Sequence, residues 1–186
     1  MKVKYSDLKN KRVFITGGGS GIGGSIVEHF CEQGSEVYFV DIDLKETKKL
    51  LNKIKKNKFR TPTFIECNLL DINKLEKTIK NIIAKKGPIH ALINNAANDD
   101  RHTTDQVDEK YWENRMAINL KHYFFAAKAV VKSMKKMKAG SIVNLSSVSW
   151  MLGEGDKVVY ETAKSAVVGL TRSFAQEYGK YNIRTN

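Results

Sequence analysis

A glycine-rich stretch between a predicted strand and a predicted helix constrains this chain more than any other feature. Residues 16–23 read TGGGSGIG, after the apolar run 13–15 and before a helical pattern over 22–33. The glycine spacing is G-x-x-x-G-x-G rather than the strict G-x-G-x-x-G. Glycines let a backbone approach phosphate, and free N–H groups at a helix N-terminus face negative charge. The stretch therefore predicts a pyrophosphate cradle, with a flexible turn as the alternative.

Strand and helix signals alternate along the rest of the chain. Apolar runs predict strands at residues 12–16, 36–40, 63–67, 89–93 and 141–145, with a sixth beginning at 182–186. Helical periodicity and capping residues predict helices over 22–33, 44–58, 71–86, 108–138 and 157–178. This alternation is typical of an α/β fold, a doubly wound parallel sheet in strand order 3-2-1-4-5 with the start of strand 6. A ligand is expected at the switch between strands 1 and 4, where the glycine turn and the loop 94–106 meet.

Composition excludes several classes of protein. No apolar run approaches the roughly 18 residues of a membrane span, and the N-terminus lacks the apolar core of a secretory signal. We therefore expect a cytoplasmic protein with no membrane contact, in which Cys31 and Cys67 are reduced, packed thiols. The net charge of +12 comes mostly from lysines spread over helix faces. The chain has no interleaved aromatics and no arginine-rich helix, so a general lysine bias explains the charge better than specific nucleic-acid binding. The histidines share no metal-ligand spacing.

An acidic residue ends the second predicted strand. Asp41 follows Gly23 by 18 residues, where a carboxylate can accept both ribose hydroxyls of an adenosine and repel a 2′-phosphate. This favours NAD over NADP. The alternative role, capping the next helix, is partly served by Asp43.

Three further residues carry candidate chemistry. Tyr160 and Lys164 are four apart, so they share one face of the helix predicted there. Ser147 lies at the end of the fifth predicted strand. Together with T-G-x-x-x-G-I-G at 16–23, N-N-A-A at 94–97 and Asn119, these motifs resemble the short-chain dehydrogenase/reductase family over essentially the whole chain.

The resemblance implies a Rossmann-like fold and hydride transfer between a carbinol carbon and NAD. It makes Tyr160 the general base, and Ser147 a hydrogen-bond partner of the reacting oxygen. It implies that Lys164 binds the nicotinamide ribose and that Asn119 holds a water that connects Lys164 to solvent. Tyrosine has an ordinary pKa near 10. An ammonium about 4 Å away stabilises the phenolate by roughly 4 kcal/mol at an effective dielectric near 20, so Lys164 brings Tyr160 close to working pH.

The resemblance also implies which residues line the cofactor. The family more often has an aspartate where this chain has Asn68. The expected cofactor-binding residues are Gly17, Ser20, Gly21, Ile22, Gly23, Asp41, Ile42, Asn68, Leu69, Asn95, Ala96, Tyr160 and Lys164.

A narrower similarity is to the sugar dehydrogenases of this family, in NNAANDDRHT at 94–103 and NLSSVSW at 144–150. Those enzymes oxidise an aldose such as xylose or galactose at C1 to the lactone. Trp150 would offer its apolar face to a pyranose, and Arg101 and His102 would hydrogen-bond sugar hydroxyls. A solvated loop and a core or subunit-contact tryptophan are the alternatives for these residues. For the whole chain, the alternatives are a reductase of a keto group on an acyl, steroid-like or other small substrate, and a nucleotide-binding fragment without turnover.

Family members continue beyond the position of Asn186 through a substrate-covering segment and a last strand. We therefore expect residues 1–186 to form a single NAD-binding domain without that lid. The family also implies a homo-oligomer, a dimer or a tetramer, because helices after strands 4 and 5 often pair between subunits.

Overall fold

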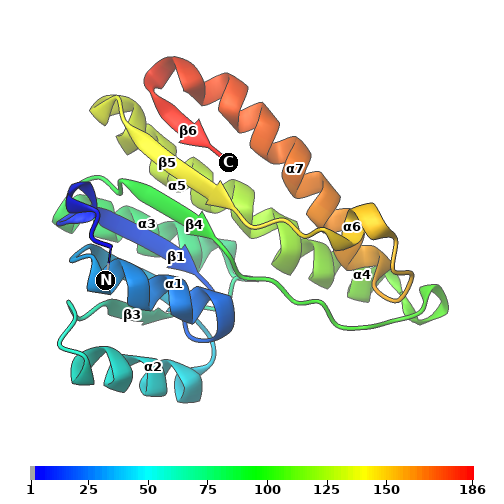
Figure 1. The fold of residues 1–186 in the computed structure, drawn as a ribbon. Coiled ribbons are helices and arrows are strands. Elements are labelled where there is room, and N and C mark those ends of the chain that lie inside the picture. The colour runs from blue at the N-terminus through cyan, green and yellow to red at the C-terminus, as the bar shows by residue number, and fades with distance from the viewer. Residues whose placement is uncertain (1–2) are drawn as a thin grey trace.

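A computed structural model, which describes residues 3–186, shows one six-stranded parallel sheet in the order β3-β2-β1-β4-β5-β6 (Figure 1). The strands are β1 (Arg12–Thr16), β2 (Glu36–Asp41), β3 (Thr63–Glu66), β4 (Ala91–Asn94), β5 (Gly140–Asn144) and β6 (Ile183–Thr185). The predicted strand order is confirmed, and β6 pairs with β5.

Seven α-helices within the described residues connect and follow these strands. They are α1 (Gly21–Glu32), α2 (Leu44–Lys56), α3 (Ile72–Lys86), α4 (Glu109–Met116), α5 (His122–Met137), α6 (Ser149–Leu152) and α7 (Val158–Tyr178). Short 3-10 turns lie at Ser6–Leu8, Thr104–Gln106 and Gly179–Tyr181. No helix in the described part of the chain combines the length and apolar character needed to cross a membrane.

The helices differ from the prediction in two places. The helix predicted over 108–138 is interrupted by a π-helical turn at Ala117–Lys121, which separates α4 from α5. The short helix α6 was not predicted, because four residues are too few to show a helical period.

Both faces of the sheet are covered, which explains why β1 is apolar without alternation. Val13 and Ile15 pack with residues of α1 and α2 on one face, whereas Phe14 packs in the cluster formed with α3, α5 and α7 on the other. All three side chains are fully buried. Burial on both faces fixes the position of β1, and the glycine turn that follows its carboxyl end is therefore also fixed.

Buried polar side chains fasten α7 to the sheet. The side-chain amide of Asn94 donates to Asn144 Oδ1 at 2.9 Å. Asn144 in turn donates to Thr171 Oγ1 at 2.9 Å, and that hydroxyl donates to the Val167 carbonyl of α7 at 2.8 Å. Buried polar groups are costly unless they are paired, so this chain of bonds fixes α7 against β4 and β5.

Replacing Asn94 with leucine tests this connection. Asn94→Leu leaves Asn144 Oδ1 without its donor inside the core, so the free energy of unfolding should fall by about 1–3 kcal/mol. Urea denaturation measures this change. The control is Asn81→Leu on the exposed side of α3, which should change stability by no more than about 0.5 kcal/mol. Equal losses in the two variants would contradict the connection.

Candidate active site

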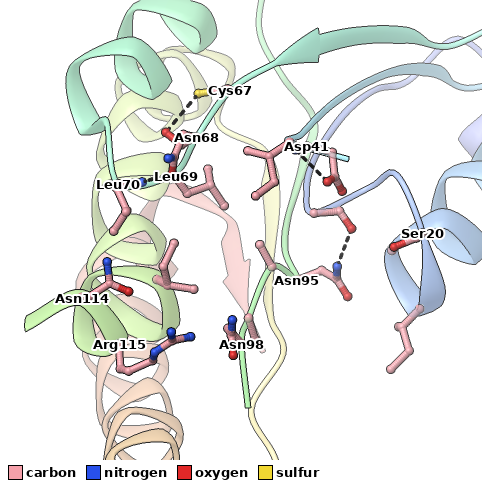
Figure 2. A pocket seen from close by; sticks show the side chains of 17 residues that line it. Ser20, Asp41, Cys67, Asn68, Leu69, Leu70, Asn95, Asn98, Asn114 and Arg115 are labelled. Atoms are coloured by element: carbon pink, nitrogen blue, oxygen red, sulfur yellow. Dashed lines mark hydrogen bonds between the residues drawn. The ribbon is translucent and has the colours of Figure 1, made fainter. Parts of the chain in front are cut away.

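A cleft of about 510 Å³ opens at the carboxyl ends of the strands. Figure 2 shows Ser20 and Asp41 on one side of it and Asn114 and Arg115 on the other. The structure brings these predicted cofactor residues together on its wall: Gly17, Ser20, Ile22, Gly23, Asp41, Ile42, Asn68, Leu69, Asn95 and Ala96. The cleft thus lies where β1 and β4 diverge, at the expected switch point.

The glycine turn is shaped for close approach by a ligand. Gly17 has a φ of 64°, which favours glycine, and a Cβ on Gly23 would lie 1.8 Å from the Gly17 carbonyl oxygen. The side chain of Ser20, the N-cap of α1, makes no capping bond to the helix. The first N–H groups of α1 are therefore available to an anion. These features fit the pyrophosphate of a dinucleotide.

Asp41 is held rigidly at the end of β2. Its Oδ2 accepts a hydrogen bond from the Gly19 N–H at 2.7 Å. Its Oδ1 accepts from the N–H groups of Ile42 and Asp43, at 2.7 and 2.9 Å. Asp43, not Asp41, caps α2 by accepting from Glu46 N–H at 2.9 Å. A carboxylate has about four acceptor sites, two on each oxygen, so one site remains free, on Oδ2, where a ribose hydroxyl can donate.

Tyr160 and Lys164 lie together on α7. Lys164 Nζ is 5.6 Å from the centroid of the Tyr160 ring, and only 1% of the lysine is exposed. The ammonium donates to the Leu145 carbonyl at 2.6 Å and to the Tyr123 hydroxyl at 2.9 Å. Burial lowers the pKa of Lys164 from 10.5 to about 8. A desolvated cation beside a phenol is an arrangement that favours phenolate formation.

Ser147 follows β5 and is part of a local hydroxyl pair. Its Oγ lies 2.8 Å from Ser149 Oγ and accepts from the Ser149 N–H at 3.2 Å. The lining of the 510 Å³ cleft does not include Ser147, Tyr160 or Lys164. It does not include Gly21 either. Lys164 is nevertheless linked to the cleft wall through Tyr123, whose hydroxyl lies 3.4 Å from the carbonyl oxygen of Ala96.

Asn119 lies in the π-helical turn and is fully buried. Its side-chain oxygen accepts from the Asn98 N–H at 2.8 Å, and its side-chain nitrogen donates to the Asn98 carbonyl at 2.9 Å. The side chain thus fixes the loop after β4. The predicted water contact of Asn119 stays a prediction.

His102 points into the protein rather than toward a substrate. Its Nε2 accepts from the Val159 N–H at 3.3 Å, and its Nδ1 lies 2.9 Å from both the Asp100 carbonyl oxygen and the Tyr111 hydroxyl. Because Nε2 accepts, we assign the proton to Nδ1. The residue preceding α7, Lys157, makes no side-chain cap, so His102 caps this helix from a distant loop. Both ring nitrogens of His102 are thus bonded within the protein.

The other two predicted substrate residues lie at the surface. Arg101 forms ion pairs with Asp156 at 2.8 Å and with Glu154 at 3.3 Å. Trp150 on α6 is 37% exposed, beside the exposed apolar side chains of Met151 and Leu152. Trp150 is therefore not a core residue, and its face is accessible to a ligand or a partner.

Sequence reasoning missed some residues of this region. Arg115 lines the cleft and pairs with Asp100 at 2.9 Å, and Tyr123 contacts Lys164. Their positions depend on how α4 and α5 dock, for which the sequence has no local signal.

The comparisons with known proteins agree with this geometry. A family model described as short chain dehydrogenase matches residues 11–186. The chain belongs to the short-chain dehydrogenase family. The resemblance inferred from the motifs is thereby confirmed.

Named relatives of this short-chain dehydrogenase include sugar-oxidising enzymes. It is 42% identical to the D-xylose 1-dehydrogenase of Caulobacter vibrioides over 97% of this chain and 71% of that protein. It is 39% identical to the "Probable galactose dehydrogenase GalD" of Rhizobium meliloti over 98% of this chain and 72% of that protein. The solved aldohexose dehydrogenase of Thermoplasma acidophilum superposes with a TM-score of 0.85 at 30% identity, covering 98% of this chain and 66% of that one.

The capping role of His102 leads to a stability prediction. His102→Phe keeps a ring but removes the acceptor for the Val159 N–H, so the free energy of unfolding should fall by about 1–3 kcal/mol. Urea denaturation at neutral pH measures this. His29→Phe, on the exposed part of α1, serves as the control with little expected change. If His102→Phe is as stable as the wild type, the interior histidine does not hold α7.

Proposed function

We propose that the chain is an NAD-dependent dehydrogenase that oxidises an aldose at C1 to its lactone. The observation that carries the proposal is the buried Lys164 ammonium next to Tyr160, at the carboxyl end of a sheet whose neighbouring cleft fits a dinucleotide. The names of the xylose, galactose and aldohexose dehydrogenases support the choice of sugar.

NAD is held by residues of the cleft and by Lys164, which lies outside the lining of the cleft. The first turn of α1 receives the pyrophosphate, Asp41 Oδ2 accepts a hydrogen bond from the adenosine ribose, and Lys164 reaches the nicotinamide ribose. Bound NAD supplies the acceptor for the hydride that leaves the sugar C1. The fixed carboxylate of Asp41 disfavours a 2′-phosphate, because two anions would share one site.

Tyr160 accepts the proton of the C1 hydroxyl as the bond to hydrogen at C1 breaks. Tyrosine is a weak base at neutral pH because its ordinary pKa is near 10. The Lys164 ammonium stabilises the phenolate form and so makes Tyr160 a usable base. Ser147 hydrogen-bonds the reacting oxygen and orients it toward Tyr160. A water on the Asn119 carbonyl would pass the proton onward from Lys164.

The surface near α6 would receive the sugar. Trp150 offers an apolar face for the C–H groups of a pyranose. Arg101 is already paired with two carboxylates, so it would contact sugar hydroxyls only with its remaining donors. Reduction of a keto group with NADPH is the second candidate, which Asp41 disfavours.

Two further proposals concern the setting of the enzyme. The thiols of Cys31 and Cys67 are free and buried, which supports a reducing compartment, the cytoplasm. A dimer or tetramer is proposed from the family alone.

An aldose panel tests the reaction. With NAD and xylose, galactose or glucose, the nicotinamide absorbance band should rise for at least one sugar. Tyr160→Phe should lower kcat by about 10²–10⁴-fold and leave the calorimetric NAD affinity within about threefold. Tyr5→Phe, at an exposed site, is the matched control. Turnover with secondary alcohols but no aldose would remove the sugar proposal, and undiminished turnover in Tyr160→Phe would remove the assigned base.

Cofactor choice tests Asp41 separately. Asp41→Asn keeps the size of the side chain but removes its charge, so NAD should bind about tenfold more weakly and discrimination against NADP should shrink. Calorimetry with both dinucleotides measures the ratio of affinities. Asp43→Asn makes the same change two residues away, at the cap of α2, and should leave that ratio unchanged. A ratio that is unaltered in Asp41→Asn, or equally altered in both, would refute the assignment.

A further inference from the structure

Lys164 has a second phenol beside it that the family motifs do not include. Tyr123 lies on α5, one helical turn after Asn119, and is fully buried. Its hydroxyl oxygen accepts a hydrogen bond from Lys164 Nζ at 2.9 Å, and the same Nζ is 5.0 Å from the centroid of the Tyr123 ring. The ammonium thus lies between two aromatic side chains, Tyr123 on α5 and Tyr160 on α7.

The hydrogen bonds of this ammonium can be accounted for. An ammonium has three donors. The Leu145 carbonyl takes one at 2.6 Å and the Tyr123 hydroxyl takes a second at 2.9 Å, which leaves one. The Tyr123 hydroxyl oxygen lies 3.1 Å from the Leu145 carbonyl oxygen and 3.4 Å from the Ala96 carbonyl oxygen, and its one hydrogen can be donated to either. Two fixed bonds determine the direction of the third.

No carboxylate of residues 3–186 forms an ion pair with Lys164, so only neutral groups stabilise its charge: the two oxygens and the tyrosine rings beside it. The titratable groups that face it are Tyr160 on α7 and Tyr123 and His122 on α5. Burial, and then the Lys164 charge, lowers the pKa of His122, which therefore stays neutral. Burial raises the pKa of Tyr123, which keeps its hydroxyl protonated and able to accept and donate at once. The segment that follows β5 contributes the Leu145 carbonyl to the ammonium.

We propose that Tyr123 is a positioning residue that keeps the Lys164 ammonium charged and aims its remaining N–H away from the sheet, toward the cofactor and Tyr160. This inference rests on the proposed function, because it gives Tyr123 a role in the Lys164–Tyr160 pair whose ionisation that function requires. A hydrogen bond to the charged form of a group favours that form. A phenylalanine at position 123 would fill the same space without supplying an acceptor.

The ionisation of Lys164 tests this directly, without substrate or NAD. In protein labelled with ¹³C-lysine, the Lys164 signal is the one that disappears in Lys164→Arg. Its NMR titration midpoint in the wild type is expected near the pKa of about 8 that burial imposes. Tyr123→Phe should lower this midpoint by about one pH unit. Tyr178→Phe removes the hydroxyl of another buried tyrosine, at the far end of α7, and should leave it unchanged.

An equal midpoint in the wild type and Tyr123→Phe overturns the proposal, whatever the effect on rate. Circular dichroism checks folding, and Tyr123→Met, with a flexible side chain that fills the same region, is judged by the same criterion if Tyr123→Phe does not fold. The pH–rate profile adds a second readout, because the alkaline limb of kcat should move to lower pH in Tyr123→Phe alone. A shifted midpoint in a protein that oxidises no sugar would refute the proposed function but keep this one. Sugar oxidation together with an unshifted midpoint would support the proposed function and overturn the role of Tyr123.

Discussion

A charged lysine in a dry interior is the constraint around which the active region is arranged. Burial lowers the pKa of Lys164 from 10.5 to about 8, so keeping it protonated opposes folding by roughly 3 kcal/mol. Because the unfolded chain binds this proton more tightly, the penalty is fully present below about pH 8 and is relieved as the pH rises toward 10.5. The fold must offset this penalty elsewhere, which explains the extent of polar fastening around α7.

That fastening also links the two halves of the candidate site. Thr16 at the end of β1 accepts hydrogen bonds from the N–H groups of Asn95 and Ala96, at 3.1 and 3.2 Å. The side chain of Asn95 donates back to the Gly17 carbonyl at 2.8 Å. The glycine turn and the loop after β4 therefore hold one another. The same strand β4 carries Asn94, whose bonds reach α7, so the nucleotide cleft and the catalytic helix share one rigid support.

The sequence predicted features that depend on neighbouring residues. It did not predict features that depend on contacts between distant segments. The apolar runs, the glycine turn, Asp41 at a strand end and the spacing of Tyr160 and Lys164 are patterns within a few residues. The strand pattern predicted the strand order, and the family resemblance implied most of the cleft wall. The π-helical turn at Ala117–Lys121 spans only five residues, too few to show a period of its own in the sequence. His102 was expected to face substrate because it lies in a polar loop. Its burial depends on contact with Val159, 57 residues away.

The shape of the substrate wall is decided by this histidine more than by the charges around it. Arg101 and its partner Asp156 each leave more than half of their side chain exposed, and such surface pairs contribute only about 0–1 kcal/mol. His102 is 5% exposed and bonds in the interior, where an unpaired group costs about 1–3 kcal/mol. Its partner Val159 precedes Tyr160 directly. Substitutions in the loop that holds His102 will therefore act on Tyr160, the proposed general base, as well as on the surface proposed to receive a sugar.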